Sequence, residues 1–153
     1  MAKGLDRPAA RRTAGALNAY VDSSVLLRVI LGEPGRLPSW SRIDLAMSSD
    51  LIRLECLRTI DRARIQLQLD DDAVSRQRAD VLEAIDSINL IPLTNIVLER
   101  AAEPFPTLLG SLDALHLASA LLVRERYDGL LFATHDHALA AAARAVGFPV
   151  DGV

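Results

Sequence analysis

Residues 111–143 read SLDALHLASALLVRERYDGLLFATHDHALAAAA, and this segment carries the strongest structural signals in the chain. It predicts a helix that begins near Asp113, a turn at Asp128-Gly129, a short strand over residues 130–133 and an alanine-rich helix after Asp136. The first helix is apolar on nearly every side, and such a helix has no solvent face. We therefore expect it to be buried between other elements. An acid at its beginning then needs an explanation.

Each acid of this segment has a simple structural explanation. Asp113 follows Ser111 in the first helical turn, where a carboxylate is favoured by free N–H groups and by the helix dipole. Asp136 follows Thr134 and precedes the alanine-rich helix, so it can serve as an N-cap. Taken singly, both acids are explained better by capping than by chemistry. A functional interpretation depends on how many acids converge.

The composition favours one domain with an ordinary hydrophobic core. The chain has 153 residues, 50% of them hydrophobic, and a formal net charge of −3. A chain of this size buries on the order of 70% of its unfolded surface. Cys56 is the single cysteine, so no internal disulfide is expected and a reducing cytoplasm is the simplest location. No apolar run approaches the ~20 residues that span a bilayer, and the N-terminus lacks the apolar centre of a signal peptide.

Positive charge is concentrated in two regions. We predict that residues 1–17 form a flexible basic arm and that residues 18–153 form the folded domain. A second group of cations is made of Arg53, Arg58, Arg62, Arg64, Arg76 and Arg78. Arginine binds phosphate well, but a solvated helix face explains this group equally. The negative net charge gives no general attraction to nucleic acid, so any RNA contact requires a local patch.

Strand and helix signals alternate along the chain. Strands are predicted at residues 17–21, 44–47, 88–92, 130–133 and 148–150, and helices at residues 25–31, 50–66, 70–87, 95–102 and 138–146, with a further helix from Asp113 toward the turn at Asp128-Gly129. This alternation predicts an α/β fold with a parallel sheet covered on both faces. Ligands bind at the carboxyl ends of the strands in such folds. Asp22 and Asp136 each follow a strand and Asp113 begins a helix that leads to one, so the three acids can point into one crevice.

Several other α/β functions are excluded because their motifs are missing. The turn after the first strand reads DSSVLL, which has neither the G-x-G-x-x-G of a dinucleotide site nor the G-K-[ST] of a P-loop. A receiver domain needs a lysine near its C-terminal strands, and the last lysine here is Lys3. There is no G-x-S-x-G, C-x-x-C or H-E-x-x-H motif.

The remaining candidates are carboxylates and histidines. The carboxylates are Asp22, Glu55, Asp113 and Asp136. A surface ion pair with Arg58 is the simple explanation for Glu55. His116 is expected to pack or to form a hydrogen bond, and His135 and His137 are expected to form a solvated pair in a loop.

Four carboxylates that lie close together repel one another, and a cation would offset this repulsion. A set of oxygen ligands selects Mg²⁺ or Mn²⁺ over softer metals. A hard metal held by acids, with positions left for water and substrate, suits the hydrolysis of a phosphodiester. The acids therefore indicate metal-dependent phosphodiester chemistry, provided that they meet in space.

At these residues the chain resembles the PIN-domain family, and within it the VapC-type ribonuclease toxins of type II toxin–antitoxin systems. The resemblance rests on YVDSS at residues 20–24, the segment from Ser48-Ser49 through Glu55 to Arg58, LDALHLA at residues 112–118 and THD at residues 134–136. The blocks occur in the order of the family and cover residues 18–150. Each block is weak alone, but the four in order are a strong signal.

The resemblance implies a three-layer αβα PIN-like fold with a central parallel sheet and the activity of a Mg²⁺- or Mn²⁺-dependent endoribonuclease. Carried over by position, it implies an acidic site of Asp22, Glu55, Asp113 and Asp136. Asp22 and Asp113 would be direct metal ligands, while Glu55 and Asp136 would complete the shell or orient water. Ser23 and Thr134 match supporting hydroxyl positions.

The resemblance also implies partners. Toxins of this family cleave RNA such as tRNA, rRNA or mRNA, form homodimers, and are silenced by a cognate antitoxin whose tail enters the crevice. Family members generally begin almost at the first strand, whereas this chain has the additional basic arm. The alternative is a catalytically inactive PIN-like module that binds RNA or protein and uses its acids as helix caps.

Overall fold

The computed structural model describes residues 15–153 and contains five strands and six α-helices. The strands are β1 (Leu17–Val21), β2 (Ile43–Ser49), β3 (Asn89–Ile91), β4 (Leu131–Ala133) and β5 (Val150–Asp151). The helices are α1 (Ser23–Ile30), α2 (Leu51–Gln66), α3 (Asp71–Asp86), α4 (Asn95–Ala102), α5 (Ser111–Arg124) and α6 (His137–Ala145), with a 3₁₀ turn at Trp40–Arg42. Of the arm predicted over residues 1–17, residues 1–14 lie outside the described part of the chain. β1 begins at Leu17.

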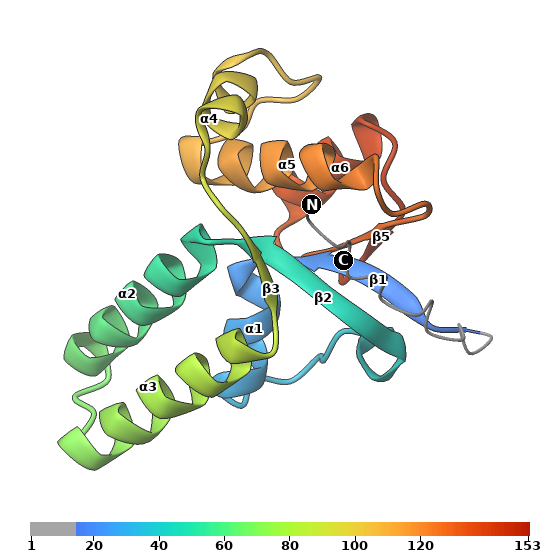
Figure 1. Ribbon diagram of the computed structural model, residues 1–153. Helices are drawn as coiled ribbons and strands as arrows, with labels where there is room; N and C mark the ends of the chain where they lie inside the picture. Colours follow the sequence, from blue (N-terminus) through green and yellow to red (C-terminus); the bar gives the residue numbers. More distant parts are fainter. Residues whose placement is uncertain (1–14) are drawn as a thin grey trace, which may run out of the picture.

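The sheet is parallel throughout and its strand order is β3-β2-β1-β4-β5 (Figure 1). The first strand of the chain is therefore the central strand, with Tyr20 opposite Met47 on one side and Phe132 on the other. Tyr20 and the two residues that flank it are buried, as expected for a parallel strand covered on both faces. The predicted α/β class and the three-layer αβα arrangement are confirmed.

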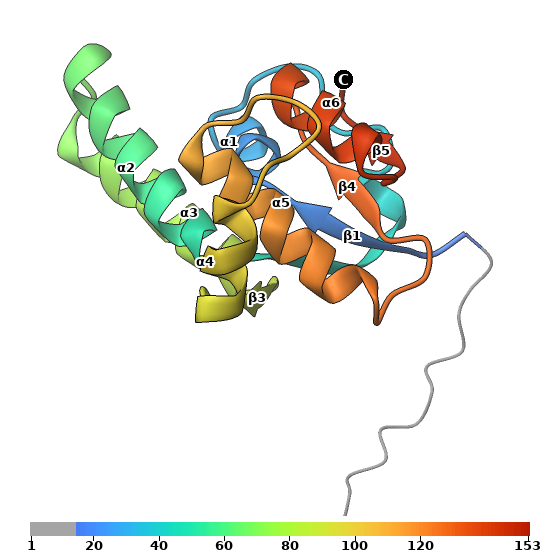
Figure 2. The same cartoon turned by 90° about the horizontal axis from the view of Figure 1, so that it is seen from above.

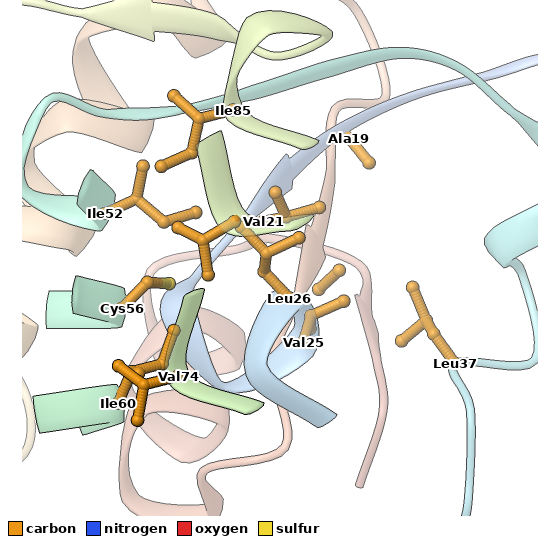
Figure 3. Packing of buried hydrophobic residues seen from close by; sticks show 12 residues of the cluster. Ala19, Val21, Val25, Leu26, Leu37, Ile52, Cys56, Ile60, Val74 and Ile85 are labelled. Atoms are coloured by element: carbon orange, nitrogen blue, oxygen red, sulfur yellow. The ribbon is translucent and has the colours of Figure 1, made fainter. Parts of the chain in front are cut away.

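Helices α1, α2 and α3 cover one face of the sheet. Figure 3 shows Val21 of β1 among side chains from these helices, including Leu26, Ile52 and Ile85. An apolar stripe on α2 faces this core, because Ile52, Cys56 and Ile60 are fully buried. The stripe ends at Ala63, which is half-buried. This layer fixes the direction of α2 and hence the position of the acid that α2 carries.

Helices α5 and α6 cover the other face, and α4 packs against the outer side of α5 (Figure 2). Leu117 of α5 and Leu139 of α6 meet Tyr20 and Phe132 of the sheet. The expectation that α5 has no solvent face is wrong at its edge, since Leu122 is 40% exposed. Within residues 15–153 no helix is both long enough and apolar enough to cross a bilayer.

Candidate active site

Asp22 lies directly after the central strand and caps the N-terminus of α1. Its side chain is 4% exposed and accepts hydrogen bonds from Ser24 Oγ at 2.5 Å, Thr134 Oγ1 at 2.8 Å and the Val25 amide at 3.4 Å. Burial raises the pKa of Asp22 above its ordinary value, although these hydrogen bonds act in the opposite direction. The carboxylate is thus oriented on both oxygens and remains costly to ionise.

Two hydroxyl groups hold Asp22, and one of them comes from a position that the resemblance did not indicate. Thr134 was expected near the site, and its Oγ1 also accepts the Asp136 amide at 3.0 Å. The second hydroxyl belongs to Ser24, which in addition accepts the His135 amide at 2.9 Å. The supporting role implied for Ser23, the first residue of α1, stays a prediction. The DSS sequence gives no local signal that distinguishes the two serines.

Asp113 lies in the first turn of α5 and is half-buried. Its pKa is raised first by burial and then by the negative charges of Asp136, Asp22 and Glu55, while His116 acts to lower it. Two sets of contacts relate the acids in space: Thr134 Oγ1 bonds both Asp22 and the Asp136 amide, and His116, three residues after Asp113 on α5, contacts Glu55 of α2. That the four acids form one site stays a prediction.

Asp136 is the N-cap of α6, as capping chemistry predicted, and its Oδ1 accepts the Leu139 amide at 2.8 Å. Its side chain is exposed, unlike that of Asp22. Asp113, by contrast, does not cap α5, because Gly110 occupies the N-cap position. Capping accounts for the position of Asp136, and the helix dipole favours Asp113 in the first turn of α5, as the sequence indicated.

Glu55 points toward α5 and not along its own helix. Its carboxylate, with a side chain 17% exposed, pairs with Nε2 of His116. The ion pair with Arg58 that the sequence spacing offered does not form, since Arg58 pairs with Asp61 at 2.8 Å. Glu55 is thus held at the site by a residue distant in sequence.

The three histidines differ in their surroundings. His116 is 1% exposed and its Nδ1 lies 2.7 Å from the Tyr20 hydroxyl, which confirms the expectation of a packed, hydrogen-bonded side chain. The expectation that His135 is solvated is wrong, because its side chain is half-buried and its Nδ1 lies 2.8 Å from the Gly152 carbonyl oxygen. His137 is exposed on α6, as expected.

The arginine group lies on the exposed sides of α2 and α3. Arg58 pairs with Asp61, and Arg64 pairs with Asp71 at 2.9 Å. Paired arginines have less charge available for phosphate, so these contacts favour the interpretation as a solvated helix face.

The donor set fits a hard divalent cation. Burial raises the pKa of Asp22, and burial together with neighbouring negative charges raises the pKa of Asp113, so a bound cation would stabilise both carboxylates in their ionised form. In the part of the chain that the structure describes, no group of three or more histidine, cysteine or acidic side chains is placed to hold a metal ion. Mg²⁺ is usually held by one or two carboxylates together with waters, so a site of that kind needs fewer protein ligands.

The fold and this acidic edge agree with the result of comparing the chain with known families. The model of the PIN domain matches residues 19–145, and the chain therefore belongs to the PIN-domain family. Within that family it is of the VapC type. It is 32% identical over 136 residues to "Ribonuclease VapC47" of Mycobacterium tuberculosis (strain CDC 1551 / Oshkosh), an alignment that covers 84% of this chain and 92% of that protein.

A solved structure supports the fold independently. The chain superimposes on the crystal structure of PAE2754 from Pyrobaculum aerophilum with a TM-score of 0.52, covering 89% of this chain and 85% of that one. The sequence identity is 17%, so this likeness concerns the arrangement of the elements alone.

Proposed function

We propose that this protein is a Mg²⁺- or Mn²⁺-dependent endoribonuclease that acts as the toxin of a toxin–antitoxin pair. The observation that carries the proposal is the set of contacts across the sheet edge: Thr134 Oγ1 joins Asp22 to the Asp136 amide, and His116 of α5 holds Glu55 of α2 beside the helix that carries Asp113. The raised pKa of Asp113, to which neighbouring negative charges contribute, agrees with it. Membership of the VapC type, with a relative named as a ribonuclease, makes RNA the substrate.

In this proposal Asp22 and Asp113 hold the metal directly, while Glu55 and Asp136 complete the shell and orient water. Asp22 is suited to this role because two hydroxyls fix its carboxylate before any ligand arrives. A bound divalent ion would supply Lewis-acid stabilisation of the charge on the scissile phosphate. Exposed Asp136 lies at the solvent side, where an RNA phosphate and an incoming water can reach it.

The fixed hydroxyls have a second purpose in this mechanism. Ser24 and Thr134 donate to Asp22, so its oxygens cannot rotate away from the site when the neighbouring acids repel them. Ser23 is adjacent and remains a candidate for the same support. The four acids also carry negative charge, so an RNA phosphate is repelled unless a divalent ion is present. We therefore expect that both RNA binding at the site and RNA cleavage require the metal.

The partners proposed for the protein follow from the VapC type. The substrate is an RNA, of the tRNA, rRNA or mRNA class, and a cognate antitoxin keeps the enzyme inactive. We also propose that the protein forms a homodimer and works in the cytoplasm, where Cys56 stays reduced. Cys56 is buried and its pKa is raised to about 12, so it is poorly reactive as a thiol.

The test is removal of single charges from the site. Asp22→Asn and Asp113→Asn should leave the circular dichroism spectrum unchanged, abolish Mn²⁺ binding measured by calorimetry, and abolish RNA cleavage and growth arrest. Asp128→Asn is the matched control, since Asp128 lies in an exposed turn and should behave as the unaltered protein. Retained cleavage in both site variants would contradict the proposal. RNA affinity that is unaffected in both variants, without cleavage under any divalent ion, would instead favour the inactive binding module.

A further inference from the structure

A chain of buried hydrogen bonds leads from the central strand to Glu55. The Ser49 amide donates to the Tyr20 hydroxyl at 3.1 Å, and this hydroxyl lies 2.7 Å from Nδ1 of His116. Nε2 of the same imidazole contacts Oε1 of Glu55. Tyr20 is 0% exposed and His116 is 1% exposed, so water does not compete for these bonds. The chain joins β1, α5 and α2, which come from distant parts of the sequence.

The direction of each bond follows from the donors available. The Ser49 N–H can only donate, so the Tyr20 oxygen accepts it. The Glu55 carboxylate can only accept, so Nε2 of His116 carries a hydrogen, and Nδ1 of the neutral ring then accepts the Tyr20 proton. A ring nitrogen that accepts a proton donor carries no hydrogen, and the neutral imidazole then has its hydrogen on Nε2. That N–H points at Glu55. The Glu55 carboxylate and the Tyr20 hydroxyl thus favour the same tautomer of His116.

The aromatic surroundings hold this chain rigid. The Tyr20 ring stacks on Phe132 with a centroid distance of 5.3 Å and an interplanar angle of 18°. It meets the His116 ring edge to face at 5.9 Å and 78°. Neither ring can turn without disturbing the packing around β1, so the Nε2–H direction is fixed. One Glu55 oxygen is engaged by this N–H, and the second remains for water or a cation.

We propose that Tyr20 and His116 are positioning residues that hold the Glu55 carboxylate in place at the acidic site. The inference rests on the proposed metal-dependent function. It assigns a positioning role to two buried residues that are not themselves acidic. Side chains behind a metal-site ligand orient it, and their loss typically lowers metal affinity by ~10–100-fold. A helix-borne glutamate without such a partner has several rotamers, and only some of them face the site.

The first test measures Mn²⁺ affinity of the folded full-length protein by calorimetry. Tyr20→Phe removes the hydroxyl and keeps the ring, and His116→Leu removes the donor to Glu55. Both should bind Mn²⁺ ~10-fold more weakly than the unaltered protein. His116→Gln should restore binding to within ~3-fold, because the amide nitrogen of glutamine lies near the position of Nε2 and can donate to Glu55. Tyr127→Phe is the matched control and should leave affinity unchanged, since Tyr127 lies away from the acids at the end of α5.

The second test observes the tautomer directly, without metal. Long-range ¹H–¹⁵N spectra of the metal-free protein should show His116 as the Nε2–H tautomer, and Tyr20→Phe should increase the population of the Nδ1–H form. A purely packing role for Tyr20 would leave the tautomer unchanged in this variant. An Nδ1–H tautomer in the unaltered protein would overturn the inference, as would unchanged Mn²⁺ affinity in Tyr20→Phe and His116→Leu.

The two proposals fail in different ways. Mn²⁺ binding that Asp22→Asn abolishes, but that Tyr20→Phe and His116→Leu leave intact, overturns the positioning role and leaves the nuclease proposal standing. An unaltered protein that binds no Mn²⁺ overturns both. Thermal unfolding of each variant shows whether it is folded. If His116→Leu does not fold, Tyr20→Phe still tests the positioning role, because it removes a single hydroxyl group.

Discussion

Thr134 Oγ1 donates a hydrogen bond of 2.8 Å to Oδ2 of Asp22, a residue 112 positions earlier in the chain. The two residues follow β4 and β1, which are neighbours in the sheet. Thr134 also accepts the Asp136 amide at 3.0 Å, so one hydroxyl connects a buried acid with an exposed one. The acidic edge is therefore assembled by the pairing of two strands, and changes in either strand end should affect the other.

Ser24→Ala should be more harmful than Ser23→Ala. Ser24 donates to Asp22 Oδ1 and accepts the His135 amide, so alanine removes the partner of that amide and leaves Oδ1 with the Val25 amide alone. We expect a loss of about 1–3 kcal/mol in the free energy of unfolding, measured by urea denaturation, together with weaker cleavage. Ser23→Ala should change stability by less than about 0.5 kcal/mol. If Ser23→Ala lowers cleavage more than Ser24→Ala does, then Ser23, which the resemblance implied, is the supporting residue.

Asp113→Asn should stabilise the metal-free protein at neutral pH. The folded pKa of Asp113 is raised above the ordinary value of 3.8, so the folded state binds the proton more tightly than the unfolded state. The resulting stability is complete below pH 3.8 and is lost as the pH rises through the raised value. Asparagine does not ionise, so the variant should gain up to about 1 kcal/mol at pH 7, where solvent screening limits the effect. The gain should disappear in melts recorded near pH 3.5, and a gain that is equal at both pH values would contradict the repulsion.

Divalent ions should raise the melting temperature, and chelation should reverse the rise. A ligand that binds only the folded state at 100 times its Kd adds about 2.7 kcal/mol of stability. Mn²⁺ or Mg²⁺ should therefore raise the Tm of the unaltered protein in thermal melts. Asp22→Asn should remove the increase, because it takes away the carboxylate that the hydroxyls hold. An equal increase in this variant would place the ion elsewhere on the protein.

Gly152→Ala should disturb the end of β4 from outside the site. Gly152 has a φ of +113°, and a Cβ atom there would lie 2.2 Å from the Thr134 carbonyl oxygen. Backbone must shift to relieve this contact, so we expect a loss of about 2 kcal/mol or more in denaturation experiments. Gly129→Ala is the matched control, because Gly129 has a φ of +69° but no atom within 4 Å of its Cβ position. It should cost about 1 kcal/mol, and an equal loss in both variants would mean that the close contact adds nothing.

Local sequence signals predicted the elements well. The helix at residues 95–102 and the strand at residues 17–21 agree with α4 and β1 at both ends. Capping chemistry located the start of α6 at Asp136 and the start of α3 at Asp70, which accepts the Ala73 amide at 2.7 Å. The last strand was expected at residues 148–150 and lies at Val150–Asp151, since Phe148 packs in the core instead. Short edge strands have few local signals to fix their limits.

The contacts of the site side chains were harder to predict because they join distant segments. Glu55 and His116 are 61 positions apart, and the spacing of Glu55 to Arg58 suggested a nearer partner. His135 was expected in solvent, and its contact with Gly152 depends on the packing of β5 beside β4. The four acids were candidates from their positions beside predicted strands and helices, and the resemblance implied their roles. Their joint role as a metal site stays a prediction.

The central place of β1 in the sheet also affects when the protein can become harmful. Tyr20 is made early, but its neighbour Phe132 must be translated before β1 is paired on both sides. At ~5–20 residues per second, a ribosome needs on the order of 5–20 s to cover that interval. A product that ends before residue 134 would lack Asp136, one of the four acids, and Thr134, which bonds Asp22. The contacts of the proposed site can therefore form only after residue 136 has been translated.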